Sequence, residues 1–75
     1  MIKKDAEQIK NNIGKILKIK RIELELSQEQ IAARTGLGQA MISKIELGKG
    51  NPSIKSIIEY CNCVNIDLER LIRGQ

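Results

Sequence analysis

The stretch of sequence that decides the fold is residues 26–53, LSQEQIAARTGLGQAMISKIELGKGNPS. Its first half begins at Ser27, which has a glutamine three residues later, and ends at Gly36. A serine and a glutamine at this spacing are typical of a capping box at a helix start, and glycine tolerates the left-handed backbone that ends many helices. The pattern therefore predicts one helix at residues 28–35 and a second at residues 39–47, with a tight turn between them.

The two predicted helices share an apolar register that suits close packing. Counted from Gln28, the apolar residues at the fourth, tenth, fifteenth and eighteenth positions are Ile31, Leu37, Ile42 and Ile45. Ala32 is small at the point where the helices are expected to cross. Because Ile42 and Ile45 attach the second helix to the core, its opposite face is expected to point outward. That face carries Gln39, Ala40, Ser43 and Lys44, with Met41 at its flank.

Helices are also predicted on both sides of this stretch. An amphipathic stripe places a long helix from about Ala6 to Glu23 or Leu24. Glu25 then stands where a left-handed residue would help, which is costly for a residue other than glycine, so a strained or longer turn is expected there. Two shorter helices follow a loop rich in helix breakers. This loop is residues 48–52. The first of the two helices begins after the cap residue Ser53 and ends at Asn65, and the second begins after the cap residue Asp67. The sequence therefore predicts an all-α fold, with five helices in a single domain at residues 1–75.

Composition narrows the classes of function. The chain has 75 residues, of which 13 are basic and 9 are acidic, with a formal charge of +4. This excess favours a polyanionic partner such as nucleic acid, and an amphipathic helix at residues 3–22 lying on a membrane is the alternative. With no histidine, no phosphate loop and no nucleophile–base spacing, we expect no enzyme, no cofactor and no metal site. Cys61 and Cys63 are expected to be reduced core residues of a cytoplasmic protein without membrane spans.

Four segments in this order resemble the Cro/repressor-type helix-turn-helix family: residues 26–32, 36–37, 42–49 and 51–53. This family includes lambdoid phage repressors, bacterial xenobiotic-response regulators, restriction–modification controllers and many antitoxins. The resemblance covers about residues 13–72 and implies a compact five-helix domain of the lambda-repressor-like type. It also implies that the helix-turn-helix at residues 28–47 binds double-stranded DNA, with its second helix in the major groove. Residues 1–11 lie outside the resemblance as an N-terminal helix extension with no assigned role.

The resemblance also assigns site residues by position. It assigns contacts with bases to Gln39, Ala40, Ser43 and Lys44. It assigns contacts with phosphates to Gln28, Met41, Lys49 and Asn51. Gln39 has the donor and acceptor that pair with adenine, and Lys44 suits guanine or a phosphate. Two residues depart from the family pattern: Gly38 provides no polar cap for the recognition helix, and Met41 has neither a hydroxyl nor a charge.

Two further roles follow from the resemblance. Arg21 and Glu46 match a pair that joins the first helix to the end of the third, and we expect a partly buried, charge-assisted bond between them. Gln28 matches a glutamine that contacts the DNA backbone and braces the first glutamine of the recognition helix, which here is Gln39.

The family's usual solution to weak binding by one small domain is a homodimer on a pseudo-palindrome. The candidate interface is the C-terminal apolar set Ile66, Leu68, Leu71 and Ile72, which we expect to divide between the core and the interface. The sequence thus predicts a sequence-specific transcription regulator, and a repressor rather than an activator. The alternative is an antitoxin or another partner-binding protein whose DNA binding serves autoregulation. Its protein partner would then be a toxin, whereas an activator would contact RNA polymerase.

Overall fold

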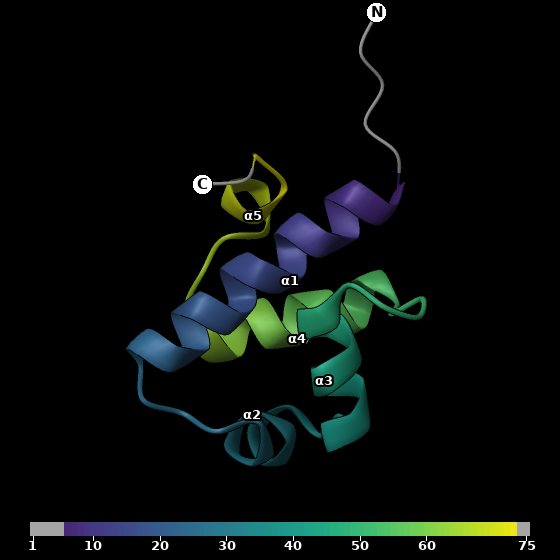
Figure 1. Cartoon of the computed structure of the whole chain (residues 1–75). Coiled ribbons are helices and arrows are strands. Elements are labelled where there is room, and N and C mark those ends of the chain that lie inside the picture. Colours follow the sequence, from purple (N-terminus) through teal and green to yellow (C-terminus); the bar gives the residue numbers. More distant parts are fainter. Residues whose placement is uncertain (1–5, 74–75) are drawn as a thin grey trace, which may run out of the picture.

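The computed structural model describes residues 6–73, and within them the chain forms five α-helices and no strand (Figure 1). The helices are α1 (Ala6–Glu23), α2 (Gln28–Thr35), α3 (Gln39–Leu47), α4 (Ile54–Val64) and α5 (Leu68–Arg73). All five lie where the sequence predicts them, so the predicted all-α class is confirmed. Of the N-terminal extension at residues 1–11, the part before residue 6 lies outside the described residues.

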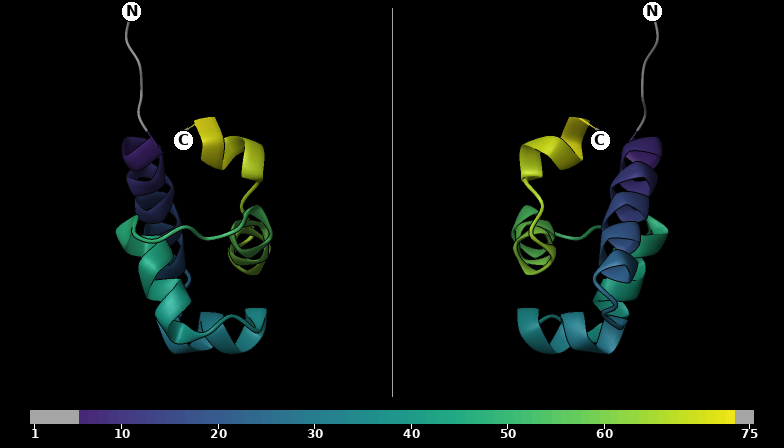
Figure 2. Two further views of the ribbon diagram at one scale, coloured as in Figure 1. Left: turned by 90° about the vertical axis from the view of Figure 1, so that its right-hand side faces the viewer. Right: turned by 90° about the vertical axis from the view of Figure 1, so that its left-hand side faces the viewer.

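The five helices surround one core. α1 and α3 lie against each other in one half of the molecule, and α4 lies across the core from them (Figures 1 and 2). α2 closes one end of the domain, where it contacts both α3 and α4. α5 turns back at the opposite end and packs on α1. The unit formed by α2, the turn and α3 therefore stands at one end of the domain, with one side of α3 uncovered.

Local caps set the ends of α2. Ser27 Oγ accepts a hydrogen bond from the Gln30 amide at 3.0 Å, and Gln30 Oε1 accepts one from the Ser27 amide at 2.8 Å. At the other end Gly36 adopts the left-handed conformation with φ of 80°, and its amide donates to the Ala32 carbonyl. The predicted capping box and the predicted terminator are both confirmed.

Within residues 6–73, two residues other than glycine also adopt the left-handed conformation. Glu25, after α1, has φ of 58°, and Asn65, after α4, has φ of 65°. Asn65 was predicted as a left-handed terminator, and the strained turn expected at Glu25 takes this form. At the start of α4, Ser53 Oγ accepts a hydrogen bond from the Ser56 amide at 3.1 Å, as its cap role predicts. Helix ends here follow from short-range hydrogen bonding and need no tertiary contact.

α1 and α3 approach each other closely at Gly14, in the middle of α1. A Cβ atom at this position would collide with the carbonyl oxygens of Ile45 and Glu46, the second at 2.5 Å. Glycine inside a helix is unfavourable for the isolated helix, so its presence here is explained by this backbone contact. Gly14 therefore sets how closely α1 supports the second helix of the helix-turn-helix.

The C-terminal apolar set divides between core and surface. Ile66 and Leu71 are buried, with exposed fractions of 9% and 1%. Leu68 is partly buried and packs against the core, whereas Ile72 is 63% exposed. The set thus divides as expected, and the assignment of Ile66 and Leu71 to a dimer interface is corrected, because both side chains belong to the buried core of the domain.

Aliphatic side chains, Cys61 and Tyr60 form the core, and partly buried apolar residues such as Ile13, Ile16 and Leu37 pack against it. The fully covered core residues are Leu17, Ile31, Ile42, Tyr60, Cys61, Val64 and Leu71. Among residues 6–73, no helix is both long enough and apolar enough to cross a membrane.

Candidate DNA interface

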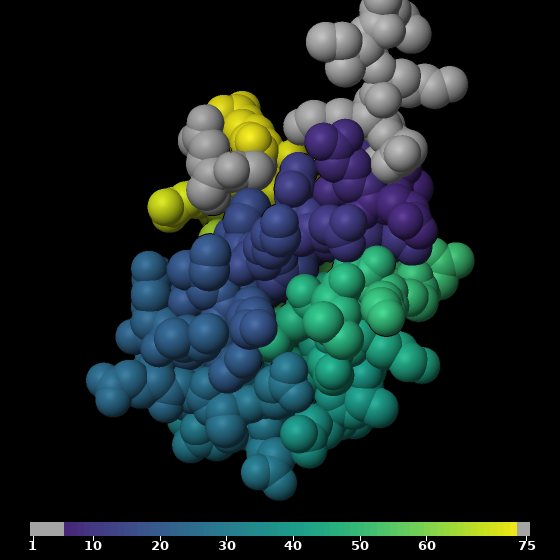
Figure 3. Space-filling model, viewed as in Figure 1, coloured from purple at the N-terminus to yellow at the C-terminus, as the bar shows by residue number. Residues whose placement is uncertain are grey.

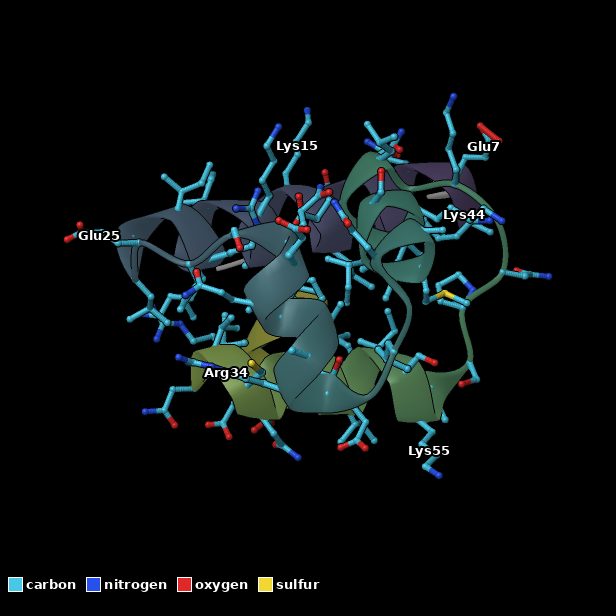
Figure 4. All side chains as sticks on the ribbon, turned by 90° about the horizontal axis from the view of Figure 1, so that it is seen from below. Glu7, Lys15, Glu25, Arg34, Lys44 and Lys55 are labelled. Carbon is cyan, nitrogen blue, oxygen red and sulfur yellow. The ribbon has the colours of Figure 1, made fainter. Side chains whose placement is uncertain are left out.

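The outer side of α3 presents the side chains for which base contacts were predicted. Gln39, Ala40 and Lys44 are exposed and Ser43 is half-buried. Figure 4 shows Lys44 directed away from the core beside α3. Ile42 and Ile45, on the opposite side of the same helix, have exposed fractions of 0% and 2%. The fold therefore exposes three of the four predicted residues to solvent, and Ser43 lies at the edge of the exposed side.

The start of α3 has no side-chain cap. Gly38 occupies the N-cap position in an extended conformation, and its carbonyl accepts the amides of Met41 at 3.0 Å and Ile42 at 3.1 Å. Within residues 6–73, no hydrogen bond engages the amides of Gln39 and Ala40. These two N–H groups at the positive end of the helix dipole remain free to bind an acceptor.

Met41 does not suit the phosphate contact predicted for it. Its side chain is half-buried and packs against the core, and its amide is already bonded to the Gly38 carbonyl. A thioether donates no hydrogen bond, so neither part of this residue offers a donor to a phosphate oxygen. We therefore withdraw Met41 as a phosphate contact, because the pairing of its amide and the packing of its side chain leave it without a free donor.

A buried carboxylate at the end of α3 joins four parts of the fold. Arg21 donates to both oxygens of Glu46, from Nε to Oε2 at 2.6 Å and from Nη2 to Oε1 at 3.2 Å. Gln28 Nε2 donates to Oε1 at 3.0 Å, and the Tyr60 hydroxyl donates to Oε2. Arg21 Nη1 also donates to the Leu26 carbonyl at 2.7 Å, which fastens the turn before α2. The predicted contact between Arg21 and Glu46 is present, and we call these four side chains the Glu46 cluster.

The electrostatics of the Glu46 cluster follow from burial and pairing. The Glu46 side chain is 2% exposed and that of Arg21 is 12% exposed. Burial alone would raise the pKa of Glu46, but hydrogen bonds from Arg21, Tyr60 and Gln28 outweigh it and lower the pKa. Burial is the main cause that raises the pKa of Tyr60, and the neighbouring Glu46 carboxylate raises it further. The cluster therefore holds an ionised carboxylate and a neutral phenol between α1, α2, α3 and α4.

The Glu46 cluster changes what is expected of Gln28. Its side-chain amide is engaged with Glu46, and no hydrogen bond joins it to Gln39 within residues 6–73. The sequence interpretation missed this contact, and it also missed Tyr60 and Gly14. Two signals were available: Tyr60 is the only aromatic residue in the chain, and a buried tyrosine hydroxyl usually has a partner, while a glycine in mid-helix suggests a close backbone contact.

The loop after α3 carries the other two predicted phosphate contacts. Lys49 and Asn51 are both exposed, and the Lys49 amide closes the end of α3 on the Lys44 carbonyl at 2.9 Å. From the other side of the loop, Lys10 Nζ in α1 donates to the Gly50 carbonyl at 2.8 Å. Polar and positive groups are thus presented next to α3, on a loop that α1 also contacts.

Comparison with known proteins agrees with this geometry. A family model described as helix-turn-helix matches residues 17–71, and the chain belongs to this family, as the resemblance to Cro/repressor-type proteins predicted. It is 34% identical over 59 residues to the "ImmF control region 10 kDa protein" of Bacillus phage phi105, a match covering 79% of this chain and 66% of that protein. It is 31% identical over 52 residues to the "Uncharacterized HTH-type transcriptional regulator y4dJ" of Sinorhizobium fredii, covering 69% of this chain and 68% of that protein. The matched part thus spans about two thirds of each relative's length.

Proposed function

We propose that this protein is a sequence-specific, DNA-binding transcription regulator that reads the major groove with α3. The observation that carries the proposal is the position of α3: its inner side is fixed in the core, while Gln39, Ala40 and Lys44 stand in solvent. The family match, and the regulatory names of the two relatives, support the same function.

The exposed groups on α3 fit particular base edges. Gln39 lies in the first turn, where a helix entering the major groove comes closest to the bases, and its amide pairs with N6 and N7 of adenine. The Ala40 methyl suits a thymine methyl, and Lys44, one turn later, suits O6 and N7 of guanine or a phosphate. Ser43 is half-buried, so its hydroxyl reaches a base only where the groove approaches α3 closely.

Contacts to the DNA backbone come from two segments in this proposal. Lys49 and Asn51 extend from the loop after α3, and the first amides of α2, which donate to no acceptor within residues 6–73, offer further donors. Because the Gln28 side-chain NH₂ is engaged with Glu46, we assign its phosphate contact to the main-chain amide. Each ionic phosphate contact should steepen the loss of affinity with salt, so Lys49 should contribute about one unit to the slope of log K against log salt.

We further propose that the protein binds as a homodimer and acts as a repressor at a pseudo-palindrome. Of the four predicted interface residues, Leu68 and Ile72 retain surface that a second copy can cover. A groove between α1 and α5 adds Ile19, which is 57% exposed. A two-fold axis near α5 would repeat the recognition helices at about 34–36 Å, one turn of DNA.

The proposal is tested by selecting bound sequences from random DNA with the wild-type protein and with Gln39→Ala. If Gln39 reads adenine, the variant should lose preference at one symmetric position in each half-site, while the other positions keep theirs. Such a contact discriminates by about 1–3 kcal/mol. The matched control is Asn62→Ala, which removes an exposed amide from α4 and should leave the selected sequences unchanged. A wild-type protein that enriches no sequence, even at low salt, would refute sequence-specific binding.

A further inference from the structure

The first turns of α1 lie against the loop that follows α3. Figure 3 shows the N-terminal part of α1 in direct contact with the segment around residue 50. The family match begins only at residue 17, so this part of α1 lies outside the matched residues. The contact between α1 and the loop is therefore a feature of this chain that membership of the family does not explain.

Two contacts fasten the loop to α1. Lys10 Nζ donates to the Gly50 carbonyl at 2.8 Å. One residue further along α1, Asn11 covers Gly48 so closely that a Cβ atom there would collide with Asn11 Oδ1 and lie 3.0 Å from its Cα. The loop thus rests on Asn11 and is held from one side by the Lys10 ammonium.

Few other hydrogen bonds fix the conformation of the loop. Gly48 and Gly50 have φ values of 70° and 69°, so the chain turns through two left-handed positions within three residues. Hydrogen bonds from the Gly48 and Lys49 amides close the end of α3, but they lie before the turn at Gly50. Within residues 6–73, the bond from Lys10 is the one hydrogen bond that reaches the backbone of residues 50–52.

We propose that Lys10 is a positioning residue for DNA binding: it holds the loop at residues 48–52 so that Lys49 and Asn51 meet the DNA backbone. The proposal rests on the proposed function. A glycine-containing loop fixed before binding loses less conformational freedom when it meets the phosphates, and this difference appears as affinity. In this role Lys10 acts through the loop and not through a contact of its own with the DNA.

The main test is a double-mutant cycle with Lys10→Met and Lys49→Ala, measured as dissociation constants for the selected operator. Lys10→Met should weaken binding between about two- and tenfold, the range expected when one ordered group must be fixed on binding. In the Lys49→Ala background the same substitution should have a clearly smaller effect, because the contact that Lys10 positions is already gone. The melting temperature should not change, since the Lys10 bond is at the surface.

Lys15→Met provides the matched control. Lys15 is exposed on the same helix, and it lies about 140° around the helix axis from Lys10, so the substitution removes the same charge without touching the loop. It should change affinity less than Lys10→Met does. Equal effects of the two substitutions, or an effect of Lys10→Met that is the same with and without Lys49, would overturn the positioning role.

A second measurement needs no DNA. Backbone order parameters of Gly50 and Asn51 from ¹⁵N relaxation should be lower in Lys10→Met than in the wild type, whereas those in the core of α4 should be unchanged. Unchanged order parameters in the loop would also overturn the proposal. If the wild-type protein binds no DNA, the proposed function fails, and the relaxation measurement still shows whether Lys10 holds the loop.

Discussion

Gln28 Nε2 donates a hydrogen bond to Glu46 Oε1 at 3.0 Å, joining the first residue of α2 to a residue in the last turn of α3. The same carboxylate accepts from Arg21 in α1 and from Tyr60 in α4. The angle between the two helices of the helix-turn-helix is therefore fixed by one buried anion as well as by apolar packing. A small domain with one aromatic residue gains from such a cluster, because within residues 6–73 no buried side-chain nitrogen or oxygen lacks a hydrogen-bond partner.

Arg21→Met should be among the most destabilising single substitutions in this chain. It leaves the Glu46 carboxylate, with a side chain 2% exposed, without its counter-charge. Breaking a buried pair in this way costs about 3–5 kcal/mol of unfolding free energy. Denaturant unfolding measures this loss of stability. Arg73→Met is the control, because Arg73 forms an ion pair with Glu69 that is exposed, and not buried like the pair of Arg21 with Glu46. Equal midpoints for the two variants would contradict a structural role for Arg21.

Tyr60→Phe should also lower the free energy of unfolding, but by less than Arg21→Met does. The ring remains in the core, and only the hydroxyl that donates to Glu46 is lost. Because Arg21 and Gln28 still satisfy the carboxylate, we expect a loss of about 1–2 kcal/mol. Thermal unfolding monitored by circular dichroism measures it. A stability equal to that of the wild type would mean that the phenol hydroxyl contributes nothing to the cluster.

Acid should destabilise the protein through Glu46. The hydrogen bonds of the cluster lower the pKa of this carboxyl from its ordinary value of 4.5, so the folded state holds the proton less tightly than the unfolded state. The stabilisation is therefore complete above the unfolded pKa and is lost as the pH falls through the folded pKa. Glu46→Gln should flatten the fall of unfolding free energy below about pH 5, relative to wild type. Parallel pH profiles for the two proteins would show that Glu46 is not the group responsible.

Gly14→Ala should destabilise the fold, although alanine is the better helix former. The added methyl would collide with the carbonyl oxygens of Ile45 and Glu46, so α1 and α3 must separate. Forcing a group into such a contact costs about 1–3 kcal/mol. Gly38→Ser is the matched control, because a Cβ there meets nothing within 4 Å and the serine hydroxyl can cap α3. It should be neutral or stabilise by a few tenths of a kcal/mol, about what a serine cap gains over glycine. Equal denaturant midpoints for Gly14→Ala and Gly38→Ser would contradict the close contact at Gly14.

The sequence was sufficient for the helix limits because their signals are local. The capping box at Ser27 and the left-handed residues at Glu25, Gly36 and Asn65 depend on a few neighbouring residues, so they are readable without a tertiary structure. The ion pair between Arg21 and Glu46 came from family resemblance, since no spacing rule joins residues 25 positions apart.

Contacts that depend on helix orientation could not be predicted in the same way. Tyr60 meets Glu46 only because α4 crosses the core at a particular angle to α3. Gln28 could have turned toward DNA, toward Gln39 or toward Glu46, and a free glutamine side chain has no intrinsic preference among them. Ile66, Leu68, Leu71 and Ile72 are all apolar, so only the packing of α5 on α1 decides which are buried.

The neighbouring residues Leu71 and Ile72 allow the proposed dimer to be separated from the fold. Ile72 is 63% exposed, so Ile72→Glu should leave the monomer's stability unchanged but place a charge in the proposed interface. We expect a shift toward monomer in sedimentation and a weaker operator complex. Leu71 is 1% exposed, so Leu71→Ala should instead cost about 2–5 kcal/mol of unfolding free energy, as in other apolar cores. A dimer of wild-type strength in Ile72→Glu would place the two-fold contact on another surface, and the exposed side of α1 at Ile19 would be the next to test.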